Sequence, residues 1–169
     1  SDMAVAMRLL DATIETVKAD GSTRQIPVAD FYRLPKDTPH IETVLETGEL
    51  ITHVVLPAPI KGMHTYDKVR DRASYAFAVV SCAAVIEVDD NGKLTSVSLA
   101  FGGIGTQPWR NEAVEALLEG TDGNDEIISQ AADLLLTEAK GSGQNNFKIP
   151  LTRRLFKQVI QRALASRLL

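Results

Sequence analysis

The chain of 169 residues contains a single cysteine, Cys82, and only three histidines. One cysteine excludes an internal disulfide, a zinc site made of thiolates and an iron–sulfur cluster held by this chain's cysteines alone. Because Cys82 stands within an apolar stretch, we interpret it as a small buried side chain. The histidines lack the spacing of metal ligands, so no metal site is predicted.

Long apolar runs and a surplus of basic residues are also missing. No run approaches the roughly 18 residues that a membrane helix needs, since Ser81 and Glu87 interrupt the stretch 76–88. The chain has 18 Lys and Arg against 22 Asp and Glu, a net charge of −4, and the basic residues are scattered. This composition predicts no membrane span and argues against a nucleic-acid partner.

Hydrophobic residues make up 44% of the chain, which is enough for a globular core. In the first part, the apolar spacing predicts a helix over 3–12, with Asp2 in the N-cap position, and then a hairpin over 13–28. Prolines make 29–48 a connecting loop, and a strand over 50–56 ends at Pro57 and Pro59.

The second part of the sequence predicts a three-stranded antiparallel sheet followed by helices. Its strands are expected over 66–70, 77–88 and 94–101, and the turn sequence Asp-Asn-Gly at 90–92 joins the last two. Helices are expected over 112–119 and 125–140 and from Pro150 onward. A sheet with segregated helices predicts the α+β fold class.

Two groups of basic residues suggest binding chemistry, and each has a structural alternative. Alternation along a strand places Lys68, Arg70 and Arg72 on one face, which favours either an anionic ligand or a solvated edge strand. The basic residues of the last helix lie opposite its apolar stripe, which favours either a solvated face or docking to an acidic partner. These basic residues are Arg153, Arg154, Lys157, Arg162 and Arg167.

The sequence contains no motif that predicts a catalytic residue. The glycines at 102–105 follow a hairpin strand and lack the parallel strand–helix setting of a dinucleotide loop, so we interpret them as a tight strand exit. No nucleophile elbow of the form G-x-S-x-G is present either.

Four stretches along the chain carry more information together than separately. They are SDMAVA at 1–6, GELIT and LP within 48–57, KVRDRASY at 68–75, and GG and PWR within 102–110. In this order and spacing they resemble the FAD-binding medium subunit of the xanthine dehydrogenase and aldehyde oxidoreductase family of molybdenum flavoproteins. The resemblance runs over essentially the whole chain, and QNNFKIP at 144–150 is similar to the stretch before the final helix in bacterial members.

The resemblance implies a division of the chain into two units. Residues 1–57 are similar to the second subdomain of the FAD-binding domain, 58–62 form a linker, and 63–169 are similar to the flavoprotein C-terminal domain. The family's first FAD subdomain and its two glycine-rich segments have no counterpart in this sequence. The chain therefore resembles the C-terminal portion of a longer subunit, and FAD binding is expected of that subunit.

The resemblance also implies four cofactor-binding residues. Asp2 matches an acidic residue that accepts hydrogen bonds from the sugar-like portion of FAD, and Lys68 matches a lysine near the isoalloxazine that favours the reduced, anionic flavin. Ile51 matches an apolar residue packed near the flavin, and Tyr75 matches an aromatic residue against the flavin face. The structural alternatives are a helix N-cap for Asp2, a solvated edge strand for Lys68, a core-strand residue for Ile51 and ordinary edge packing for Tyr75.

The function implied by the resemblance is that of an oxidoreductase subunit that transfers electrons. In the family, a molybdopterin-binding subunit with the molybdenum cofactor hydroxylates an aldehyde or N-heterocycle, and an iron–sulfur subunit with its clusters relays electrons to FAD. FAD then passes them to NAD, a quinone, ferredoxin or dioxygen. The lack of a signal-peptide pattern favours the cytoplasm, with export to the periplasm on a partner's signal as the other route. The alternative function is a docking module, derived from the same C-terminal domain, that has lost flavin.

Overall fold

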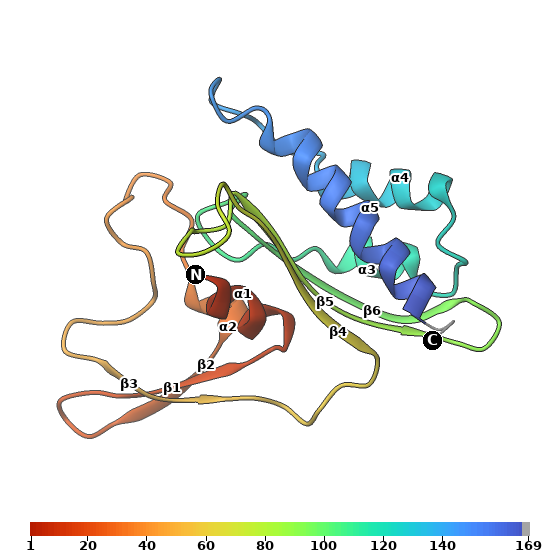
Figure 1. The fold of residues 1–169 in the computed structure, drawn as a ribbon. Helices are drawn as coiled ribbons and strands as arrows, with labels where there is room; N and C mark the ends of the chain where they lie inside the picture. The colour runs from red at the N-terminus through yellow and green to blue at the C-terminus, as the bar shows by residue number, and fades with distance from the viewer. Residues whose placement is uncertain (167–169) are drawn as a thin grey trace.

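The computed structural model describes residues 1–166 and contains two three-stranded antiparallel sheets with helices packed on them (Figure 1). The strand orders are β2-β1-β3 and β4-β5-β6. The predicted α+β class is therefore confirmed. Arg167, the last basic residue predicted for the final helix, lies outside the described residues.

The first unit is a sheet with two short helices. It comprises α1 (Asp2–Leu9), β1 (Thr13–Val17), β2 (Thr23–Pro27), α2 (Val28–Phe31) and β3 (Leu50–Val55). The three strands lie where the alternation of apolar residues predicted them. Helix α2 was not predicted, and it forms because Val28 and Phe31 pack on Ile14 and Ile26.

Helix α1 begins with a different cap from the predicted one. Ser1 is the N-cap, and its hydroxyl accepts a hydrogen bond from the backbone N–H of Ala4 at 3.3 Å. Asp2 is therefore the first helical residue, where its negative charge suits the helix dipole. The Asp2 carboxylate is left free to bond elsewhere.

The second unit carries the remaining helices. It comprises β4 (Met63–Val69), β5 (Val80–Val88), β6 (Leu94–Gly102), α3 (Glu112–Leu118), α4 (Asp125–Leu135) and α5 (Lys148–Ser166). The three-stranded sheet is confirmed, but α4 ends at Leu135 rather than at 140, because the polar residues after Leu136 have nothing to bury on that face. Helix α5 begins at Lys148, two positions before Pro150.

The loop between β4 and β5 corrects two further predictions. Strand β5 begins at Val80 rather than at 77, because residues 70–79 have no opposing strand and leave Phe77 94% exposed. Strand β4 ends at Val69, so Arg70 and Arg72 lie in the loop. They do not share a strand face with Lys68.

Helices cover both faces of the sheet β4-β5-β6 (Figure 1). On one face, α3 and α5 pack over Cys82, Ile86 and Phe101, and α4 packs against these two helices. On the other face, α1 packs over Ala83 and Val85. This double cover explains the unbroken apolar run of β5. Cys82 is fully buried, as predicted, and burial raises the pKa of its thiol, so it is unreactive.

Helix α1 belongs to the first unit in the sequence but packs on the sheet of the second. Its Val5 and Leu9 contact Ala83, Val85 and Ala100. The first unit therefore supplies one layer of the second unit's core, and the start of α1 is brought to β4.

Arg110 strengthens this junction through a buried ion pair. Its Nε and Nη2 donate to the two carboxylate oxygens of Glu115 at 2.8 and 3.0 Å. Its Nη1 donates to Asp11 Oδ2 at 2.9 Å and to the carbonyl of Leu9 at 3.2 Å. Glu115 also accepts the backbone N–H of Leu99 at 2.7 Å. Arg110 thus joins the end of α1 to β6 and α3.

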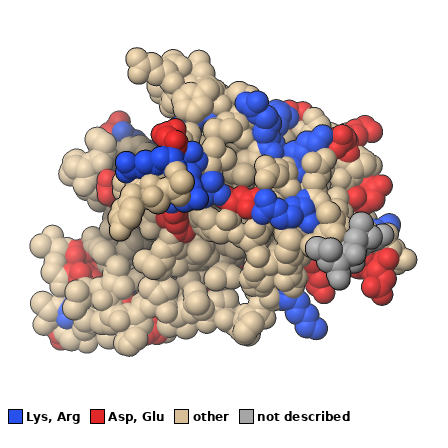
Figure 2. All heavy atoms as spheres, in the orientation of Figure 1, with Lys and Arg blue, Asp and Glu red and all other residues tan. Residues whose placement is uncertain are grey.

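The basic residues of α5 are largely paired with carboxylates. The ion pairs are Arg153–Asp133 (2.6 Å), Lys157–Asp125 (2.9 Å) and Arg162–Asp67 (2.6 Å). Figure 2 shows basic and acidic side chains interleaved on this side of the molecule. The described part of α5 therefore fits a solvated face better than a docking site for an acidic partner. No helix within residues 1–166, α5 included, is long and apolar enough to cross a membrane.

A second carboxylate cluster holds the long segment 32–49 on the first sheet. Arg24 donates to both carboxylate oxygens of Glu49, at 2.6 Å each, and the Thr16 hydroxyl and the backbone N–H of Glu46 also donate to Glu49. These donors, Arg24 first, lower the pKa of Glu49 from 4.5 to about 2.

We expect Glu49 to make the stability of the protein acid-sensitive. Because its pKa is lower in the folded state, its stabilising effect is complete above about pH 4.5 and is lost as the pH falls towards about 2. Urea unfolding over this pH range should show Glu49→Gln less stable than wild type near neutrality and equal to it in acid. Glu42→Gln, at an exposed position of the same segment, is the control; an equal loss in both variants would contradict the assignment.

Candidate functional site

Asp2 and Lys68 meet at the junction of α1 and β4. The Lys68 ammonium donates to Asp2 Oδ2 at 2.7 Å. Alternation along β4 puts Lys68 and Tyr66 on the same face, the one that α1 covers. The side chains of Lys68 and Asp2 remain 24% and 47% exposed, so both are accessible to a ligand. The structure therefore brings together two of the four predicted cofactor-binding residues.

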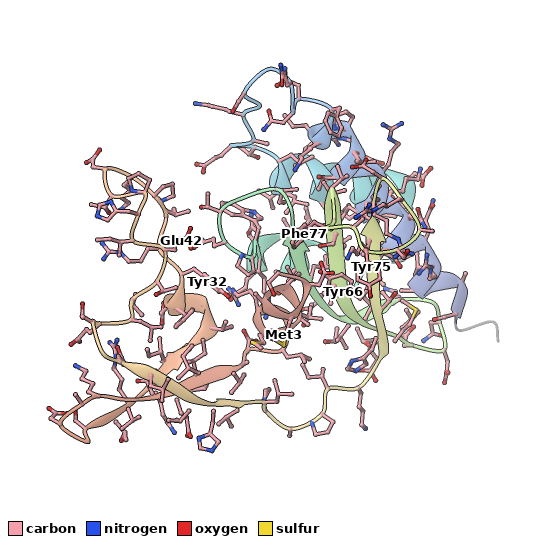
Figure 3. All side chains as sticks on the ribbon, turned by 60° about the vertical axis from the view of Figure 1, so that its left-hand side comes forward. Met3, Tyr32, Glu42, Tyr66, Tyr75 and Phe77 are labelled. Carbon is pink, nitrogen blue, oxygen red and sulfur yellow. The ribbon has the colours of Figure 1, made fainter. Side chains whose placement is uncertain are left out.

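Tyr66 and Ser81 continue this cluster inward. The Tyr66 hydroxyl donates to Asp2 Oδ1 at 3.0 Å, and it lies 3.0 Å from the hydroxyl of Ser81. Ser81 is buried at the start of β5, where the strand register places it opposite Lys68. Figure 3 shows Tyr66 near the start of α1, with Tyr75 and Phe77 on the loop at the same end of the molecule.

The charges in this cluster favour an ionised carboxylate beside a cation. The hydrogen bond from Lys68, helped by that from Tyr66, lowers the pKa of Asp2. Burial raises the pKa of Tyr66 to about 12, so its hydroxyl stays protonated and donates at neutral pH. The site thus offers an acceptor, a cation and a fixed donor within one patch.

Tyr75 stands on the loop that follows Lys68. The loop is closed at its base by a hydrogen bond from the Val79 N–H to the Val69 carbonyl at 2.8 Å. At its tip, Arg72 Nε donates to the carbonyl of Tyr75 at 3.1 Å, and Tyr75 adopts a left-handed backbone with φ of 50°. Its ring is 96% exposed, so the edge packing considered for it is not found.

Ile51 lies in the other sheet. It stands on β3 opposite Thr16 and is 42% exposed, in a strand that is exposed along its whole length. The structure therefore does not bury Ile51 in a core, and it does not place Ile51 in the Asp2–Lys68 cluster (Figure 1).

A hollow of about 510 Å³ lies elsewhere, between the turn 103–109 and the start of α5. Trp109, Leu136 and Ile149 line it, together with Lys148. The Lys148 ammonium donates to the carbonyl of Gly103 at 2.8 Å, so its charge holds the strand exit in place. None of the four predicted cofactor-binding residues lines this hollow.

Tyr66 and Ser81 are the members of the cluster that the sequence did not reveal. Tyr66 carried a usable signal, because it stands two positions before Lys68 in a predicted strand and so shares its face. Ser81 carried none, because its place depends on the register between β4 and β5.

Comparisons with known proteins show the family to which the chain is similar. Residues 64–163 match the family described as the CO dehydrogenase flavoprotein C-terminal domain, and residues 1–59 match the FAD binding domain in molybdopterin dehydrogenase. The chain is 49% identical to the aldehyde oxidoreductase FAD-binding subunit PaoB of Escherichia coli, over 98% of this chain and 48% of that protein. It is 31% identical to the glyceraldehyde dehydrogenase medium chain of Sulfolobus acidocaldarius, over 94% of this chain and 57% of that protein.

Solved structures share the fold. A chain of the CO dehydrogenase from Oligotropha carboxidovorans superposes with a TM-score of 0.82 at 23% identity, over 96% of this chain and 56% of that chain. The chain thus spans about half the length of the relatives that it matches.

Proposed function

The chain belongs to the family of CO dehydrogenase flavoprotein C-terminal domains, and on this premise we propose that it forms part of a FAD-binding, electron-transferring subunit of a molybdenum-dependent oxidoreductase. The observation that carries the proposal is the 2.7 Å pair of Asp2 and Lys68. The resemblance assigns both residues to the flavin from stretches far apart in the sequence, and the fold brings them into contact. The names of the relatives, an aldehyde oxidoreductase subunit and a glyceraldehyde dehydrogenase chain, support the same class of reaction.

The residues present fit the chemistry of FAD. Asp2 is an exposed carboxylate that accepts hydrogen bonds, which suits the hydroxyl groups of the ribityl chain. Lys68 is an accessible cation, which suits a ring that becomes anionic on reduction. Tyr75 presents a free aromatic face on the adjoining loop, and Ile51 presents an apolar side chain on the other sheet. We assign FAD contacts to these four residues.

In this proposal each residue has a limited task. FAD, when bound, supplies the two-electron chemistry that links single-electron donors to an external acceptor. Asp2 orients the cofactor by accepting its hydroxyl hydrogens, and Lys68 stabilises negative charge on the ring. Tyr75 covers one face of the ring and limits access of water. None of these four residues is given a role in the chemistry of the organic substrate.

The proposed partners are an iron–sulfur subunit and a molybdopterin-binding subunit. The resemblance implies both, and two relatives named as an FAD-binding subunit and as a medium chain fit a complex of several subunits. The proposed division into 1–57, a linker at 58–62 and 63–169 is supported by the end of β3 at Val55 and the start of β4 at Met63.

The test of the proposed function is an absorbance spectrum between about 350 and 500 nm. It is recorded for the natively purified full-length product of the gene and, beside it, for the 169-residue chain alone. A flavin band in the native protein supports the proposal. The absence of flavin from both, even after incubation with FAD, would overturn it and favour the docking module.

Lys68 provides a quantitative prediction. If the ring were bound about 10 Å away, a unit charge would contribute roughly 1.7 kcal/mol at an effective dielectric constant of about 20. Since about 1.4 kcal/mol corresponds to about 30 mV for a two-electron couple, Lys68→Met should lower the flavin midpoint potential by about 35 mV.

The measurement is a redox titration of the native protein and two variants. Lys61→Met removes the same charge from an exposed position in the linker and should leave the potential unchanged. Equal potentials in wild type and Lys68→Met would remove Lys68 from the flavin site.

A further inference from the structure

Tyr66 occupies a central place among the charged residues of the site. Its hydroxyl donates to one oxygen of Asp2, at 3.0 Å, while Lys68 donates to the other oxygen at 2.7 Å. Both oxygens of the carboxylate are thereby held, one by a neutral donor and one by a cation. The orientation of the carboxylate is fixed by two donors from the same strand.

The Tyr66 hydroxyl also contacts a second, buried hydroxyl. It lies 3.0 Å from the hydroxyl of Ser81, which is 1% exposed. Space beside Ser81 is closed, because a Cβ added at Gly102 would lie 2.5 Å from Ser81 Oγ and 2.8 Å from Val5 Cγ2. The hydroxyl of Ser81 therefore has a defined position between β6 and α1, and it defines the position of the Tyr66 hydroxyl.

The chain of hydrogen bonds ends in the protein interior. Ser81 is buried, so the series from Lys68 through Asp2 and Tyr66 to Ser81 does not lead to solvent at its inner end. A proton path to the flavin is therefore not its role. The series instead orients the groups at its outer end, which are accessible to a ligand.

We propose that Tyr66 is a positioning residue of the flavin site: held by Ser81, it fixes the carboxylate of Asp2 and thereby sets how much of the positive charge of Lys68 acts on the flavin. The proposal rests on the proposed function. The O–H dipole of Tyr66 points its positive end at Asp2 and offsets part of its charge. Without this dipole, the negative charge of Asp2 acts on Lys68 and on the flavin with less compensation.

The direction of the effect follows from this charge balance. Tyr66→Phe should lower the flavin midpoint potential, by less than Lys68→Met does, because a dipole is removed rather than a full charge. It should also raise the Kd for FAD by about 3- to 10-fold, since the Asp2 carboxylate loses one of the donors that orient it. In the protein freed of FAD, the pKa of the Asp2 carboxyl should rise, which carbon NMR of labelled aspartate can measure.

The decisive experiment uses the natively purified protein in four forms: wild type, Tyr66→Phe, Asp2→Asn and the double variant, each titrated at saturating FAD. If Tyr66 acts through Asp2, its substitution shifts the potential in the wild-type background and not in Asp2→Asn. Ser81→Ala removes the hydroxyl that holds Tyr66, and it should shift the potential in the same direction by a smaller amount. Tyr32→Phe, at a tyrosine packed edge-on against Phe31, is the matched control.

Each outcome decides the matter. An equal shift in both backgrounds would show that Tyr66 acts independently of Asp2 and would overturn the inference. Unchanged potentials in Tyr66→Phe and Ser81→Ala, with a clear shift in Lys68→Met, would also overturn it while the proposed function stands. A wild-type protein without flavin would overturn both. Thermal unfolding of every variant is the folding control. If Tyr66 had a purely structural role, Tyr66→Phe would lower the unfolding temperature.

Discussion

Replacement of Glu115 by alanine should lower the free energy of unfolding by about 3–5 kcal/mol, the usual cost of removing one member of a buried ion pair. The side chains of Glu115 and Arg110 are each only 8% exposed. Without Glu115, the Arg110 guanidinium loses two hydrogen bonds in a place that water scarcely reaches. The backbone N–H of Leu99 loses its acceptor as well.

Urea unfolding measures this loss, and the chain offers a matched control on the same helix. Glu112 is the first residue of α3, but its side chain is 76% exposed and stands 4.0 Å from Arg8. Glu112→Ala should therefore change stability by less than about 0.5 kcal/mol. The double variant Glu115→Ala with Arg110→Met should recover part of the loss, because it leaves no unpaired buried charge. Equal effects of the two glutamate substitutions would contradict the role given to the buried pair.

Replacement of Phe156 by alanine should cost a similar amount, about 3–5 kcal/mol, for an entirely different reason. Phe156 stands on α5 and is fully buried, and its ring centre lies 6.2 Å from that of Phe101 on β6. Its removal leaves a cavity between the helix and the sheet and ends an aromatic contact.

The control for Phe156→Ala is the same substitution at Phe77. That ring is 94% exposed in the loop between β4 and β5, so Phe77→Ala should leave the urea midpoint almost unchanged. Chemical denaturation of both variants makes the comparison direct. A larger loss at Phe77 than at Phe156 would mean that the loop is packed against a surface in solution.

The sequence predicted the local features of the fold well, because their signals are local. The first hairpin follows from alternation around Asp20-Gly21, and the second from the turn at 90–92. Errors arose where the outcome depends on distant contacts. Phenylalanine is typical of strands, but no neighbouring strand pairs with Phe77, and the expected strand begins only at Val80.

Only part of the site could be predicted, because some of its contacts depend on how distant strands pair. Asp2 and Lys68 were proposed from the resemblance, and the structure places them in contact with each other. That these two residues, and likewise Ile51 and Tyr75, lie beside a flavin stays a prediction. Tyr66 lay within reach of a simple alternation argument. Ser81 did not, because its contact with Tyr66 requires the pairing of β4 with β5 and of β5 with β6.

The crossing of α1 onto the second sheet has a consequence for assembly. Asp2 stands in one unit and Lys68 in the other, so the proposed cofactor site exists only while the two units are docked. Any state in which α1 detaches separates the carboxylate from the ammonium and uncovers one face of the second sheet. Cofactor retention would then report on the docking of the two units, and loss of the flavin would mark subunits whose halves have come apart.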